Sequence, residues 1–269
     1  MALVSMQSAA TGLSALNTNL DVIANNLANV NTTGFKGSRV NFQDLLYMEK
    51  AQPGVENSNG DQRPTGIYIG LGVKVSGTQL SLEQGSLIST GRQLDIAIDG
   101  AGFLQVGVEP DAAPNGIAYT RAGALTINAD GELVLASDQG RRIQPVIQIP
   151  DNAESITFNT TGEVFVTIPG QADPQQVGVI ETATFINPQG LSQLGENLFG
   201  ETEASGPPIT GQPGDENRGT LQQNFLEGSN VDPTKELIDM IRTQRAFEMN
   251  SQTIRTSDEM LRTVSQLAR

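Results

Sequence analysis

The chain has 269 residues, no histidine, no cysteine and no tryptophan, and 30 acidic against 16 basic side chains give it a formal net charge of -14 at pH 7. Without histidine, a Ser-His-Asp or Cys-His nucleophile lacks its base, and zinc sites built from thiolate or imidazole ligands are excluded. The acidic balance argues against nucleic-acid binding, because phosphate backbones would be repelled. No apolar run reaches the roughly 20 residues of a membrane span, and no basic residue precedes Lys36, so we expect neither membrane insertion nor a cleaved signal peptide.

The first segment predicts a long helix that ends near Gly34. Its apolar side chains recur at alternating spacings of three and four residues over more than three heptads, which is the pattern of a coiled-coil seam. The other faces carry Asn, Ser, Thr and Gln with almost no charge, which favours burial among other helices. The seam consists of Met6, Ala9, Leu13, Leu16, Leu20, Ile23, Leu27 and Val30.

The middle of the chain changes to a period of two. Residues 35–75 are predicted to be an extended connector, and Pro and Gly pairs within 47–66 and within 200–219 favour loops or extended connectors there. Alternating apolar residues and turn pairs such as Asp130-Gly131 predict a mainly antiparallel all-β domain over residues 76–228. The whole net charge belongs to residues 35–234, which indicates a solvated surface.

A second long helix is predicted near the C-terminus, with Asp232 as its N-cap and Pro233 as its first residue. Apolar residues recur every seven positions at Met240, Phe247, Ile254 and Leu261, with Leu237, Ile241 and Val264 beside them. The intervening seam positions are expected to be Gln244, Ser251, Asp258 and Ser265. This half-polar stripe is too narrow to cover the N-terminal seam, so the surplus apolar surface predicts contacts with other copies.

The predicted fold class is therefore α+β. The terminal helices, within residues 1–34 and 229–269, are expected to form a coiled-coil-like domain, and the β domain is inserted between them. Ordinary core helices remain a second interpretation of the two apolar stripes.

Three features that could indicate chemistry have simpler explanations. The cluster Asn25, Asn26, Asn29 and Asn31 could be an amide site, but polar packing and helix termination explain it better. Asp95 and Asp99 could be a carboxylate pair of a cell-wall hydrolase, but two exposed positions on one strand face are the better explanation. Gly70-Leu71-Gly72 lacks the third glycine and the following helix of a nucleotide loop. We therefore expect no catalytic residue, no cofactor and no metal.

Four sets of motifs, in order along nearly the whole chain, resemble the family of bacterial flagellar rod, hook and hook-associated proteins. They are residues 24–36, residues 95–103, residues 119–123 with 128–131, and residues 229–232 with 240–248 and 258–261. The family signature falls on Asn25, Asn26, Asn29, Asn31, Gly34, Phe35, Gln244 and Arg245.

The resemblance implies a structural subunit of the distal rod, a hollow helical homopolymer in the basal body that spans the periplasm and transmits motor torque to the hook. It also implies contacts with proximal rod proteins, the hook protein and the P and L rings, and export by the flagellar type III apparatus without a cleaved signal. Residues 47–66 are expected to brace neighbouring copies. The residues expected to carry self-assembly are Leu13, Leu16, Leu20, Ile23, Leu27, Val30, Leu237, Met240, Ile241, Phe247, Ile254, Leu261 and Val264. A proximal rod or hook-type protein of the same family is the alternative, and a wall hydrolase or a β-domain adhesin is the alternative from another class.

Overall fold

The computed structural model describes residues 2–54, 64–110, 113–170, 173–215 and 218–267. The chain divides into two compact units. Residues 1–28, 38–80 and 232–269 form the first, called the helix unit below, and residues 29–37 with 81–231 form the second, the β unit. The predicted α+β class is confirmed, because a helix lies at each end of the chain and the middle is mainly antiparallel β-structure.

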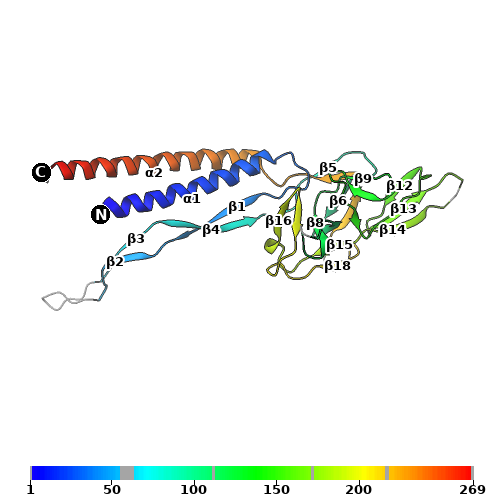
Figure 1. Ribbon diagram of the computed structural model, residues 1–269, viewed down its shortest axis with the longest axis horizontal. Coiled ribbons are helices and arrows are strands. Elements are labelled where there is room, and N and C mark those ends of the chain that lie inside the picture. Colours follow the sequence, from blue (N-terminus) through cyan, green and yellow to red (C-terminus); the bar gives the residue numbers. More distant parts are fainter. Residues whose placement is uncertain (1, 55–63, 111–112, 171–172, 216–217, 268–269) are drawn as a thin grey trace. The chain divides into compact units, whose positions relative to one another are not determined.

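Two long helices, α1 (Ala2–Ala28) and α2 (Pro233–Leu267), run side by side in opposite directions in the helix unit (Figure 1). Asp232 is the N-cap of α2 as predicted, since its Oδ1 accepts a hydrogen bond of 2.9 Å from the backbone N–H of Thr234. Helix α1 ends at Ala28, earlier than expected, so the prediction is wrong for Val30 as a helical seam residue. A turn follows instead, in which the N–H of Thr32 donates to the carbonyl of Asn29 at 3.1 Å.

The helix unit also contains a long antiparallel hairpin where a connector was expected. Strand β1 (Ser38–Asp44) pairs with β4 (Val73–Leu80), and β2 (Tyr47–Ala51) pairs with β3 (Ile67–Gly70). The loop prediction for 47–66 is therefore wrong for β2, and the expected boundary after residue 75 falls inside β4. Residues 55–63, the central part of the segment expected to act as a brace, lie outside the described residues. The exact extent of the domains stays a prediction.

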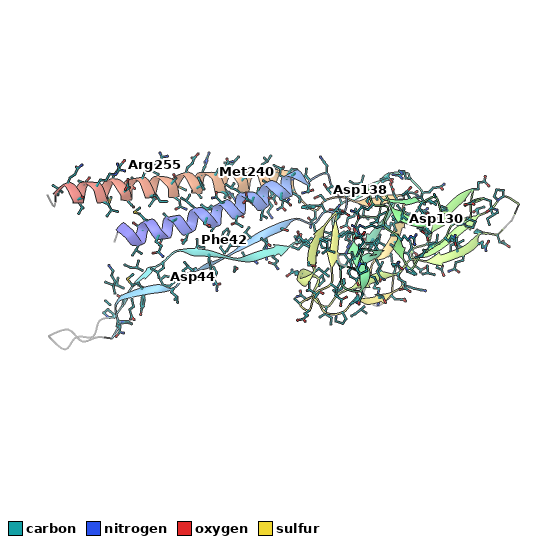
Figure 2. All side chains as sticks on the ribbon, in the orientation of Figure 1. Phe42, Asp44, Asp130, Asp138, Met240 and Arg255 are labelled. Atoms are coloured by element: carbon teal, nitrogen blue, oxygen red, sulfur yellow. The ribbon has the colours of Figure 1, made fainter. Side chains whose placement is uncertain are left out.

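The hairpin escaped sequence reasoning because the alternation of apolar and polar residues in its strands is short. Val40 and Phe42 alternate with polar residues on β1, as do Val73 and Val75 on β4. Phe42 on β1 is 46% exposed (Figure 2), and Leu46, at the junction of β1 and β2, is 82% exposed. So short an alternation is a weak signal for a strand.

The β unit holds the remaining strands, and every strand pair described in it is antiparallel. Its largest sheet has the order β16-β17-β8-β7-β15-β18, with β11 also paired to β7. One strand, β18, lies within residues 200–219, so the loop prediction for that segment is wrong there. The bounds are β5 (Leu87–Ser89), β6 (Ile96–Asp99), β7 (Phe103–Gly107), β8 (Ile117–Thr120), β9 (Leu125–Ile127), β10 (Leu133–Leu135), β11 (Ile143–Gln144), β12 (Ser155–Phe158), β13 (Glu163–Thr167), β14 (Gln175–Val179), β15 (Thr182–Thr184), β16 (Ser192–Gly195), β17 (Leu198–Gly200), β18 (Ile209–Gly211), β19 (Thr220–Gln223) and β20 (Phe225–Glu227).

The core of the β unit is aliphatic, with an aromatic cluster beside it. Ile96, Leu125 and Ile143 are fully buried among other Ile, Leu and Val side chains. The ring of Tyr119 packs edge-on against Phe185, with ring centroids 4.8 Å apart. Such contacts add to the free energy of burying the rings.

Tyr119 should make stability fall with alkaline pH. Burial, and to a smaller extent the negative charge of Glu201, raises the pKa of Tyr119 to about 12 from 10.0. As the pH rises from 10 towards 12, the unfolded chain loses this proton and the native chain keeps it, so the free energy of unfolding falls. Urea unfolding at several alkaline pH values should show a steeper fall in the parent than in a Tyr119→Phe variant. Equal pH dependence in both would contradict the assignment.

Candidate self-assembly surface

The contact between α1 and α2 contains four layers of small and polar side chains, called the polar ladder below. Each step of seven residues forward along α1 is matched by a step of seven residues back along α2, as expected for antiparallel helices in a heptad register. An apolar seam on α1 against a half-polar stripe on α2 was expected at this contact. The four layers pair Ser5 with Ser257, Gly12 with Asn250, Asn19 with Thr243, and Asn26 with Glu236.

Three layers of the polar ladder are hydrogen-bonded. The Oγ atoms of Ser5 and Ser257 lie 3.4 Å apart, and Asn19 Nδ2 donates to Thr243 Oγ1 at 3.0 Å. Asn26 Nδ2 donates to Glu236 Oε1 at 3.3 Å. Burial raises the pKa of Glu236, and the hydrogen bond from Asn26 opposes that rise by favouring the carboxylate.

The remaining layer depends on a glycine. A Cβ at Gly12 would lie 3.0 Å from the side-chain nitrogen of Asn250, so the amide would have to shift by a few tenths of an ångström to admit a larger residue. The predicted intervening positions of α2 were wrong by one residue, because Thr243 faces α1 and Gln244 is exposed. Thr243 and Gln244 are both polar, so hydrophobicity in the sequence could not show which of the two faces α1.

The apolar residues expected to carry self-assembly lie beside the polar ladder and are incompletely covered. Ile23 is buried, whereas Leu237, Ile241 and Val264 are 47%, 50% and 63% exposed. The helix pair thus leaves much of its apolar surface open, and the assembly role of these residues stays a prediction. The half-buried members are Leu13, Leu16, Leu20, Leu27, Val30, Met240, Phe247, Ile254 and Leu261.

Among the signature residues, Asn26 and Gly34 have the clearest structural roles. Asn26 forms two hydrogen bonds with the backbone of Ser38, accepting from its N–H at 2.9 Å and donating to its carbonyl at 2.8 Å. This amide therefore fixes the start of β1 against α1. Gly34 has φ +70°, and a Cβ there would lie 2.7 Å from the backbone nitrogen of Ala122. Only glycine fits both constraints.

The other signature residues are less buried. Asn29 Oδ1 accepts from the Thr32 hydroxyl at 3.1 Å, and the carbonyl of Phe35 accepts from the N–H of Asn230 at 3.4 Å. The signature residues with exposed side chains are Asn25, Asn31, Gln244 and Arg245.

A buried ion cluster in the β unit was missed by sequence reasoning. Lys36 Nζ lies 2.6 Å from Glu227 Oε1, and Arg121 Nη1 lies 3.3 Å from Glu227 Oε2. The three side chains are at most 6% exposed, and burial lowers the pKa of Lys36 while Glu227 opposes that shift. The carboxylate is 191 residues from Lys36 in the chain, so spacing could not pair them.

The residues considered for chemistry do not form a site. Asp95 is buried beside Arg92, with 3.8 Å between Oδ1 and Nη1, so the expectation that it is exposed is wrong. Asp99 instead accepts hydrogen bonds from Gln84 and Gln222. Within the described ranges, no group of three or more Asp or Glu residues could hold a metal ion, and no helix is long and apolar enough to cross a membrane.

An engineered disulfide should report the register of the polar ladder. A Ser5→Cys/Ser257→Cys variant should form a bond within one chain, because the two Oγ atoms are already 3.4 Å apart. In a Ser5→Cys/Asn250→Cys control the cysteines are offset by one heptad, about 10 Å along the helix, and should remain reduced. The chain has no cysteine of its own, so non-reducing electrophoresis is unambiguous. Equal oxidation of both pairs would contradict the register.

A methyl group at Gly34 should destabilise the β unit more than one at Gly91. Both glycines have φ +70°, so alanine brings the same backbone strain to each, about 1 kcal/mol. No atom lies within 4 Å of a Cβ at Gly91, whereas at Gly34 the backbone of residues 121–122 must move. Urea unfolding should show Gly34→Ala to cost about 1–3 kcal/mol more than Gly91→Ala. Equal losses would mean that the close approach is unimportant.

Three family models match this chain. They are described as flagella basal body rod protein, matching residues 6–36, flagellar hook protein FlgE/F/G D1 domain, matching 97–166, and flagellar basal body rod FlgEFG protein C-terminal, matching 222–267. The chain is 48% identical over 258 residues to the flagellar basal-body rod protein FlgG of Agrobacterium fabrum, covering 96% of each chain. It is 44% identical to the FlgG of Caulobacter vibrioides, covering 97% of this chain and 98% of that one, and 39% identical to the FlgG of Bacillus subtilis, covering 98% and 99%. The first model covers most of α1 and the turn after it, and the last covers β20 and the whole of α2.

Proposed function

Because the chain belongs to the family of flagellar basal-body rod proteins, we propose that it is a structural subunit of the distal rod. It polymerises into a hollow helical tube and transmits motor torque to the hook. Polymerisation is supported by one observation. The helix unit exposes apolar side chains to solvent, beside a contact between its two helices that contains polar layers.

In the polymer, hydrophobic free energy is gained where apolar surface of one copy is buried against another copy. Burying apolar surface stabilises by about 25 cal/mol per Å². The polar ladder places hydrogen bonds at the α1–α2 contact, each with a net contribution of about 1 kcal/mol. The apolar side chains remain available for neighbouring copies. In a helical polymer the same contact recurs at every subunit, so a modest gain is repeated along the rod.

The proposal extends to partners and location. The subunit joins the basal-body rod, contacts proximal rod proteins, the hook protein and the P and L rings, and is exported by the flagellar type III apparatus. We propose no enzymatic activity. The bracing role of residues 47–66 remains part of the proposal, supported by apolar side chains exposed on both strands that frame the segment, Tyr47 at 58% and Ile67 at 54%.

A charge in the apolar stripe should abolish assembly. Leu20→Asp leaves an unpaired carboxylate in a surface that the polymer buries, at a cost of several kcal/mol per contact. Cells producing the variant should not swim and should lack distal rods in electron micrographs of basal bodies. An Asn17→Asp variant, which places the same charge on an exposed face of α1, is the matched control and should swim. Normal swimming with Leu20→Asp would reject the assembly role of this stripe.

A further inference from the structure

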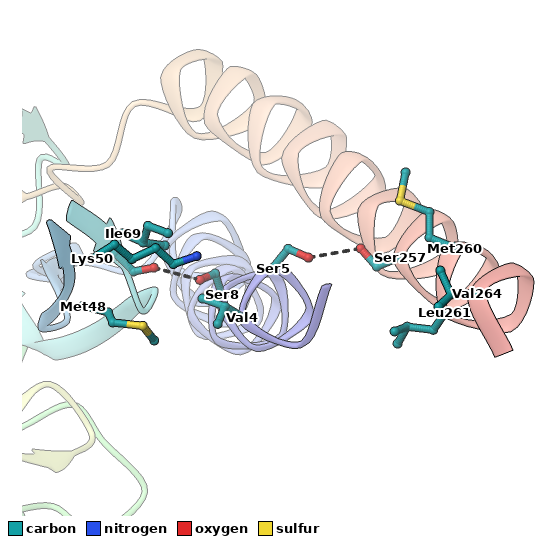
Figure 3. Close-up of a pocket in the computed structure, with 11 residues that line it drawn as sticks. Val4, Ser5, Ser8, Met48, Lys50, Ile69, Ser257, Met260, Leu261 and Val264 are labelled. Carbon is teal, nitrogen blue, oxygen red and sulfur yellow. Dashed lines mark hydrogen bonds between the residues drawn. The ribbon is translucent and has the colours of Figure 1, made fainter. Parts of the chain in front are cut away.

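One end of the helix unit has an apolar groove with a volume of about 780 Å³. Helix α1 contributes Val4 and Ser8, the hairpin contributes Met48 and Ile69, and the end of α2 contributes Met260 and Val264 (Figure 3). Two hydrogen bonds stand at the groove, Ser5 with Ser257 and Ser8 with the carbonyl of Gly70. Met260 and Val264 are 65% and 63% exposed, so the groove is open to solvent.

The opposite end of α2 has an apolar patch. Leu237, Ile238 and Ile241 are 47%, 46% and 50% exposed on the first turns of the helix. Exposed charged residues separate this patch from the groove, among them Arg245 and Arg255, of which Arg255 is labelled in Figure 2. Contiguous apolar surface of this kind marks an interaction site. Ile238 and Val264 are 26 residues apart on one straight helix, about 39 Å.

We propose that the patch of Leu237, Ile238 and Ile241 on one copy occupies the groove of a second copy. This rests on the proposed polymeric function and assigns one of its contacts. Groove and patch are different surfaces at opposite ends of one helix, so their contact is heterologous and repeats from copy to copy without closing. A non-closing contact is what an open rod requires and what a closed dimer cannot supply.

Charge supports a second copy as the occupant. Among the described residues that line the groove, Lys50 is the one with a charge. Residues 232–241, which contain the patch, carry Asp232, Glu236 and Asp239 against Lys235. A weakly acidic apolar segment therefore meets an apolar groove with a basic residue at its wall, and the two surfaces are complementary.

The absence of native cysteine allows a direct test in assembled basal bodies. In an Ile238→Cys/Val264→Cys chain, the two cysteines are too far apart for a bond within one copy. Mild oxidation should link successive copies into a series of multimers on a non-reducing gel. A Met249→Cys/Val264→Cys chain is the matched control, because Met249 is 66% exposed but belongs to neither surface, and it should give no such series. Monomers only, linkage that stops at dimers, or an equal series in the control would overturn the proposal.

Charge substitution provides a second measurement that does not depend on oxidation. Ile238→Lys alone and Val264→Asp alone should each abolish swimming, and the double variant should restore it, because every junction then pairs a lysine with an aspartate. Failure of the double variant to swim, or normal swimming by either single variant, would overturn the inference. The proposed function has a separate test, since it fails if cells without this chain still build distal rods.

Discussion

The structure depends on a helix pair that is joined by polar groups. A coiled coil normally buries its apolar seam between its own helices, and a polar residue in that seam specifies register at a cost in stability. Here every layer of the polar ladder holds small or polar side chains, from Ser5 with Ser257 to Asn26 with Glu236. These layers give the pair a defined register. Apolar side chains of α2 that remain exposed, such as Leu237, Ile241 and Val264, are left for contacts outside the pair.

The polar character of α1 has a second use, which is to hold the hairpin. A two-stranded hairpin alone is marginally stable. Ser8 donates to the carbonyl of Gly70 at 3.3 Å, Thr11 accepts from the N–H of Val73 at 3.3 Å, and Asn26 holds both backbone groups of Ser38. These contacts follow one face of α1 over its length. The uncharged polar side chains of this helix thus serve as hydrogen-bond partners for backbone.

Within the β unit, buried polar groups tie together segments that are distant in the chain. Glu227 accepts from Lys36 and Arg121, and the side chain of Asn230 accepts from the N–H of Gly37 at 2.8 Å and donates to the carbonyl of Ser81 at 2.8 Å. Removing one member of such a network leaves an unpaired buried charge or amide, which costs several kcal/mol. Gly34 adds a steric condition, because the backbone of residues 121–122 lies where its side chain would be.

The sequence by itself determined the two helices, the antiparallel β domain and the family, because heptad spacing, alternation and ordered motifs are local patterns that survive without coordinates. It also predicted that α1 has more apolar surface than α2 can cover. The tertiary structure alone decided which face of α2 meets α1, since Thr243 and Gln244 are both polar and only packing separates them. It alone revealed the hairpin, whose strands alternate too briefly to be recognised, and the pairing of Lys36 with Glu227. Long-range contacts of this kind depend on how the chain folds back on itself, and no spacing along the sequence records that.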